Sequence, residues 1–160
     1  MALSTTQAVW RSGGGDQTRT AYCGSMVMVA QFYFPATQVS GNVLNAVGGQ
    51  AVILPAGAII LEIQANGVGT GGSSPTFDMG FTLYGTGTAS PQALLNETPA
   101  DGGKQVLNWA SATTGASMGA VMSATELVYI TGRAGASAAT GGNVSGYITY
   151  YIADDGQQNN

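Results

Sequence analysis

The chain has 160 residues, only 8% of them charged, and its net charge is −4. Its four basic residues (Arg11, Arg19, Lys104 and Arg133) are scattered, whereas nucleic-acid binding requires clustered Lys and Arg, so we expect neither nucleic acid nor an anionic membrane as a partner. The absence of histidine and the single cysteine, Cys23, exclude the common histidine-based catalytic groups, an intrachain disulfide and the usual zinc site, so we expect no enzyme activity and no cofactor.

Residues 1–25 are polar and interrupted by glycines, and they predict an extended N-terminal arm. Two large aromatic residues in this segment, Trp10 and Tyr22, favour an arm that packs on a neighbouring subunit, because aromatic rings gain much from burial. The alternative is a disordered terminus. The segment lacks the basic and apolar regions of a signal peptide, so we expect synthesis in the cytoplasm without export.

Residues 26–153 predict a single β-rich domain, and the polar residues 154–160 predict a frayed C-terminal tail. Residues 26–34 are apolar on both faces, which predicts a strand covered on two sides. Further strands are expected at residues 50–54, 58–66, 76–83, 92–95, 105–109, 127–131 and 143–152. Residues 110–124 are rich in alanine but broken by glycines, so we expect an irregular segment with one helical turn at most.

The stretch of residues 54–83 carries the clearest pattern in the chain. It begins with a proline turn, and apolar residues then alternate with polar ones on both sides of the glycine-rich segment 66–72. This period of two predicts half-buried antiparallel strands, and the glycine segment predicts a flexible hairpin loop between them. A phosphate site is not expected there, because the loop joins strand to strand and lacks the lysine of a P-loop.

Glu62 and Asp78 are the two carboxylates that merit examination as a catalytic pair. A two-carboxylate glycosidase holds its acids roughly 5 to 9.5 Å apart across the substrate. Both residues fall on the polar side of their predicted strands, and we expect those strands to be neighbours. We nevertheless expect both to be ordinary solvent-exposed carboxylates.

The closing strand, residues 143–152, places Tyr147 and Tyr151 on one face with Thr149 between them. Tyrosine beside small polar residues suits a protein interface, because its ring buries area while its hydroxyl keeps a hydrogen bond. The alternative is ordinary packing between neighbouring strands. We therefore take Trp10, Tyr22, Tyr147 and Tyr151 as candidate interface residues.

About eight short strands, turn signals between them and no long helix predict an all-β protein. The expected architecture is an antiparallel β-sandwich, similar to a jelly roll, with the extended N-terminal arm attached. A surface with so little charge is typical of a protein that assembles with others.

Three motifs resemble those of small β-sandwich virion proteins from tailed bacteriophages, especially cyanobacterial and marine phages. They are residues 52–58 (VILPAGA), residues 76–80 (TFDMG) and the small-residue segment 138–141 leading to Tyr150-Tyr151-Ile152. They lie within the segments 50–83 and 126–153, whose layout carries the resemblance.

The resemblance implies a capsid decoration (cement) protein, which stabilises the head by bridging subunits of the major capsid protein. It also implies location in the virion and a homo-oligomer, with a trimer expected. The alternative is a tail or fibre module that contacts the host surface.

Overall fold

The computed structural model describes residues 27–38, 42–43 and 51–152. Within these residues the chain forms strands and no helix, and so contains no helix that could span a membrane. The strands are β1 (Met28–Pro35), β2 (Asn42–Val43), β3 (Ile53–Leu54), β4 (Ala58–Gly67), β5 (Thr76–Leu83), β6 (Ala89–Pro99), β7 (Gly103–Asn108), β8 (Val128–Ala134) and β9 (Asn143–Ile152). All eight expected strands are present, and the short β2 is the addition.

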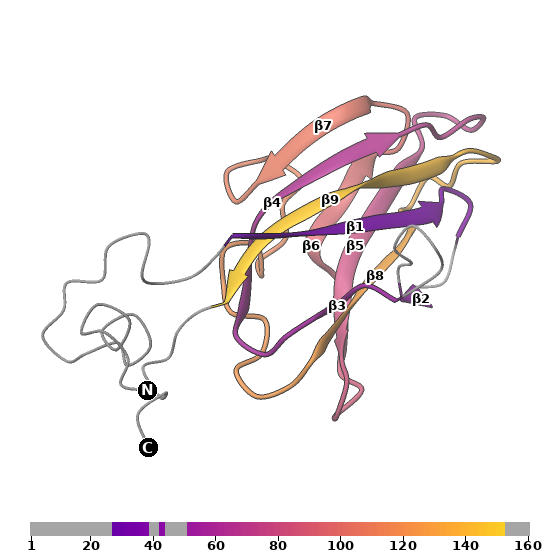
Figure 1. Ribbon diagram of the computed structural model, residues 1–160. Helices are drawn as coiled ribbons and strands as arrows, with labels where there is room; N and C mark the ends of the chain where they lie inside the picture. The colour runs from indigo at the N-terminus through magenta and orange to yellow at the C-terminus, as the bar shows by residue number, and fades with distance from the viewer. Residues whose placement is uncertain (1–26, 39–41, 44–50, 153–160) are drawn as a thin grey trace, which may run out of the picture.

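Two antiparallel sheets form the fold, as predicted. The front sheet has the strand order β1-β9-β4-β7 and lies nearer the viewer in Figure 1. The back sheet has the order β2-β8-β5-β6, with β3 also paired to β8. The chain is therefore an all-β sandwich, and the predicted arm (1–25) and tail (154–160) lie outside the described residues.

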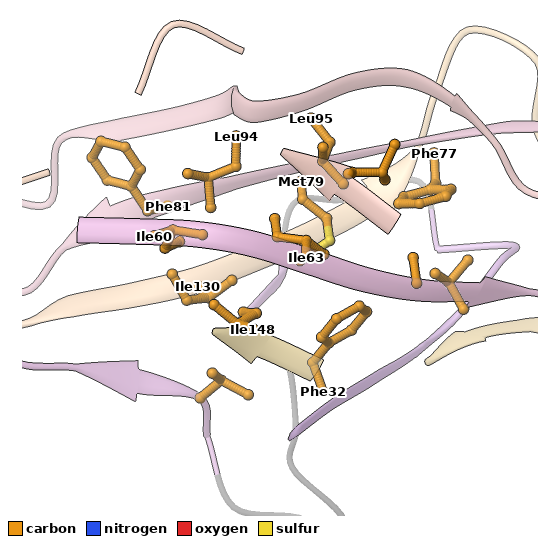
Figure 2. Packing of buried hydrophobic residues seen from close by; sticks show 14 of the residues in the cluster. Phe32, Ile60, Ile63, Phe77, Met79, Phe81, Leu94, Leu95, Ile130 and Ile148 are labelled. Atoms are coloured by element: carbon orange, nitrogen blue, oxygen red, sulfur yellow. The ribbon is translucent and has the colours of Figure 1, made fainter. Parts of the chain in front are cut away.

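The core lies between the sheets and consists of the apolar side of each alternating strand. Figure 2 shows side chains from both sheets meeting there, among them Phe32, Ile63 and Ile148 from the front sheet and Met79 and Ile130 from the back sheet. All five are almost completely buried. For β5 and β9 the sequence periodicity therefore identified the inward face correctly.

Strand β1 departs from the prediction that both of its faces are covered. It is the edge strand of the front sheet and pairs with β9 alone. Its inward residues Phe32 and Phe34 are buried, but Val29 and Tyr33 on the other side are exposed. No described residue covers that side, so its apolar character belongs to the surface of the molecule.

The prediction that the glycine-rich segment 66–72 forms a hairpin loop between two paired strands is wrong. It links β4 in the front sheet to β5 in the back sheet, so it crosses between the sheets. Its backbone is tied to neighbouring segments: the amide of Gly69 donates to the Ala100 carbonyl (2.7 Å) and that of Thr70 to the Gly141 carbonyl (2.9 Å). The expectation failed because consecutive alternating strands need not be paired with each other.

The irregular segment 110–124 forms turns and no helix. Its amides bond to the edges of both sheets, from Gly115 to the Leu94 carbonyl (2.8 Å) and from Gly119 to the Ile60 carbonyl (3.0 Å). The segment therefore caps the edges of β6 and of the first half of β4, which would otherwise expose unpaired backbone groups.

Candidate protein interface on the front sheet

The outer face of the front sheet consists of three rows of residues that run across its four strands. Cross-strand pairing places Gln31, Tyr147, Gln64 and Val106 side by side, and we name them the central row. On one side lies the lysine row, which consists of Tyr33, Ser145, Asn66 and Lys104. On the other side lies the glutamate row, which consists of Val29, Thr149, Glu62 and Asn108.

Large apolar side chains on this face are unusually exposed. Val29 is 61% exposed, Val106 60%, Tyr147 46% and Tyr33 44%. The three rows contain only one acidic and one basic residue, Glu62 and Lys104. A contiguous surface that combines aromatic and aliphatic residues with so little charge has the composition of a protein interface.

A hollow of about 550 Å³ opens on the same face. The central row lines one side of it and Ser145, Asn66 and Lys104 line the other. Gly146, which has no side chain and precedes Tyr147, also lines the hollow. The face is therefore indented beside Tyr147 and would receive a protruding side chain from a partner.

The structure brings together two of the four residues that the sequence predicted for the interface. Tyr147 lies in the centre of the outer face, and Tyr151 lies further along the same strand and is partly buried. Trp10 and Tyr22 lie outside the described residues. The interface role of all four residues stays a prediction.

A second exposed apolar surface, which the sequence analysis missed, surrounds Trp109. Trp109 follows β7 and is 74% exposed. Leu61 and Trp109 directly follow the last pair of the β4–β7 ladder, Glu62 with Asn108. The segment 119–121 reaches the same edge, because an added Cβ at Gly119 would lie 3.6 Å from the Trp109 Cβ and Val121 is bridged to Ile59. We name Leu61, Trp109 and Val121 the Trp109 patch. The available signal was a tryptophan at a strand end followed by small residues.

Glu62 and Asp78 do not form a catalytic pair. They belong to different sheets, and Asp78 is 1% exposed, so the expectation of two solvent-exposed carboxylates is wrong for Asp78. Asp78 accepts hydrogen bonds from the Arg133 Nε (3.0 Å), the Gln92 amide (3.0 Å) and the Glu97 backbone (2.9 Å). Its charge therefore has a structural role, because a buried carboxylate persists only where donors replace water.

The described part of the chain offers no cluster of three or more His, Cys, Asp or Glu residues that would hold a metal ion. Glu62, the acidic residue of the glutamate row, accepts a hydrogen bond from the side-chain amide of Gln64 (2.8 Å).

A chain in the capsid of Ralstonia phage GP4 has this fold. The TM-score is 0.50 at 15% sequence identity, and the match covers 89% of this chain and 94% of that one. A chain of the cyanophage Pam1 capsid asymmetric unit also matches, with a TM-score of 0.48 and 17% identity over 88% of this chain and 96% of that one. No family model matches the chain, and no curated protein is a significant match to it.

Proposed function

We propose that this protein is a virion structural protein of a tailed phage that binds the outside of the capsid and stabilises it by bridging subunits of the major capsid protein. The observation that carries the proposal is a combination of fold and surface. The sandwich fold is also found in a phage capsid, and large apolar side chains lie on two exposed surfaces of this chain. A protein that works alone in solution gains nothing from such surfaces, whereas a particle-bound protein uses them to attach.

The motifs that resemble those of phage virion proteins contribute to the packing of this fold. Leu54 of the first motif is completely buried, and Asp78 of the second holds Arg133. Gly80, also in the second motif, packs so closely on β6 that an added Cβ would lie 1.9 Å from the Ser90 carbonyl oxygen. These motifs therefore support a shared fold, and the residues that bind a partner must lie elsewhere.

The Trp109 patch is the surface that we assign to the capsid. Tryptophan is the residue type most enriched among those that dominate binding energy, since its large ring is fixed by only two rotatable bonds. Its neighbours Leu61 and Val121 are also exposed and would exclude water around the ring. Bridging requires a second contact for each copy, and the predicted arm, residues 1–25, is the segment that we assign to it.

The proposal is tested on particles made without this protein, to which purified protein is added back. Trp109→Ala should reduce the amount bound to pelleted capsids by at least tenfold, since truncating a central aromatic residue costs about 2 kcal/mol or more. Tyr84→Ala is the matched control, because Tyr84 is another highly exposed aromatic residue, located on the turn after β5.

Two outcomes would overturn the proposal. One is that particles without the protein survive heat and osmotic shock as well as complete particles do. The other is that labelled protein decorates tails instead of heads in electron micrographs, which would favour the tail or fibre alternative. Equal loss of binding for Trp109→Ala and Tyr84→Ala would show that the Trp109 patch is not the attachment surface.

A further inference from the structure

The outer face of the front sheet has no cover from any described residue, although its apolar side chains are as exposed as those of the Trp109 patch. The opposite side of this sheet is buried in the core. A four-stranded face with Tyr33, Tyr147, Val29 and Val106 in the open needs a partner to remove that area from water. The chemistry of the face identifies which partner fits.

The two charges on this face are placed in opposite rows. Glu62 lies in the glutamate row on β4, and Lys104 lies in the lysine row on β7. Within the described residues neither side chain forms an ion pair, and Glu62 accepts only the hydrogen bond from Gln64. Each charge is therefore available to a partner that presents the opposite sign at the matching position.

We propose that the front-sheet face binds the same face of a second copy of this chain, with a two-fold axis running along the central row. This rotation keeps each strand opposite its own counterpart and exchanges the two outer rows. Tyr33 then faces Val29 of the second copy, so apolar residues meet apolar residues. Glu62 faces Asn66 of the second copy and lies one strand spacing, about 4.8 Å sideways, from Lys104 of that copy.

A two-fold axis along the strands instead of across them is less favourable. It would place β4 opposite β9, and the two copies of Glu62 would then be offset sideways by a single strand spacing of about 4.8 Å. Like charges that face each other across an interface are repulsive. The positions of Glu62 and Lys104 therefore select the axis along the central row.

The shape of the face agrees with this arrangement. Tyr147 lies on the proposed axis, so the rings of the two copies meet there, and the hollow beside Tyr147 gives each ring a place to enter. Four strands spaced about 4.8 Å apart and about 8 residues long span an area roughly 20 by 27 Å. This is somewhat below the ~800 Å² that each partner buries in a standard interface, so we expect a dimer with a dissociation constant in the micromolar range.

This contact differs from the trimer that the sequence resemblance implies. A three-fold assembly joins two different surfaces of neighbouring copies, whereas a face that matches itself produces a two-fold dimer. The proposal does not depend on capsid binding, because the contact should form between free copies in solution.

Crosslinking provides the first test, since residues on a two-fold axis lie next to their own counterparts. In a Cys23→Ser background, Gln64→Cys should form a covalent dimer with a short bismaleimide reagent at micromolar protein concentration. Thr88→Cys is the control, because Thr88 is exposed on the loop that precedes β6 in the back sheet. Equal crosslinking of the two variants, or none at Gln64→Cys, would overturn the proposal.

Charge exchange provides the second test, read by sedimentation equilibrium of the full chain. Glu62→Lys and Lys104→Glu should each weaken dimerisation by about tenfold, because each dimer contains two such pairs and the change replaces attraction with repulsion. The double variant should return to within a few-fold of the original constant. A monomeric or trimeric wild-type protein, or a double variant no better than the single ones, would rule the arrangement out.

Discussion

At the scale of single residues, Asp78 shows what alternation in a sequence does and does not specify. Its position between Phe77 and Met79 places it on the outer side of β5, as the period of two predicts. It is buried because Arg133, its neighbour on β8, and residues of β6 surround the carboxylate. Strand β6 changes register twice against β5, at Phe77/Met79 and at Met79/Phe81. Gln92 from β6 then reaches the carboxylate. A strand pattern predicts the side on which a residue lies, but a bulge in a neighbouring strand decides whether water reaches it.

The Asp78–Arg133 ion pair leads to the first prediction. Arg133→Met should lower the free energy of unfolding by about 2–3 kcal/mol, because it leaves a buried carboxylate with fewer donors. Arg133 contacts Asp78 at 3.0 Å, and the Asp78 side chain is 1% exposed. Urea denaturation measures the change.

Lys104→Met is the matched control for Arg133→Met, because Lys104 is exposed and in no ion pair among the described residues. It should change the stability of the monomer by less than about 0.5 kcal/mol. If Arg133→Met costs no more than this control, the ion pair does not stabilise the fold.

At the scale of elements, the sequence specified the strands far better than their partners. The period of two identified β4, β5 and β9 within a few residues, because it reports which side of each strand is apolar. It does not report which strand lies alongside, and so β4 and β5 were expected to be neighbours although they lie in different sheets. The prediction that both faces of β1 are covered was wrong for a related reason. An exposed apolar face and a buried apolar face have the same residue pattern, so the sequence alone does not distinguish them.

The crossover from β4 to β5 leads to the second prediction. The amide of Val68 donates to the carbonyl of Asn143, the first residue of β9, and that of Thr70 to the carbonyl of Gly141 just before it, over 2.9 Å in each case. Gly142 has a φ of 87°, and an added Cβ would lie 1.8 Å from the Val68 carbonyl oxygen. Gly142→Ala should therefore separate the two segments and speed hydrogen exchange at the Val68 and Thr70 amides by tenfold or more.

Gly87→Ala separates the effect of this contact from that of backbone strain. Gly87 has a similar φ of 68° but has no atom within 4 Å of an added Cβ. It should cost about 1 kcal/mol through conformation alone and leave exchange at Val68 and Thr70 slower than Gly142→Ala does. The same exchange rates at these two amides in both variants would show that the crossover does not depend on this close approach.

At the scale of the whole molecule, the sandwich and the surfaces that it presents follow from different features of the sequence. The described residues 27–38, 42–43 and 51–152 contain both sheets and the core between them. The fold was predictable because burial imposes a period on the sequence. Of the two exposed surfaces, the sequence indicated only the β9 part of the front-sheet face, at Tyr147. It did not indicate the Trp109 patch or the rest of that face, because exposure of an apolar residue leaves no period and depends on how the strands are arranged.

This separation leads to the third prediction, for a chain that begins at residue 26. All core residues within the described part of the chain lie after that position, so we expect deletion of residues 1–25 to shift the midpoint of thermal unfolding by less than about 3 °C. The same deletion should weaken attachment to capsids at least tenfold, because bridging requires two contacts for each copy and the loss of one removes the gain from multivalency. Circular dichroism measures the first quantity and pelleting with capsids the second.

A truncated chain that is unfolded would place residues 1–25 within the fold instead of in an arm. A folded truncated chain that binds capsids as well as the full chain would leave the Trp109 patch as a sufficient attachment surface, and the second contact would then have to come from the described domain.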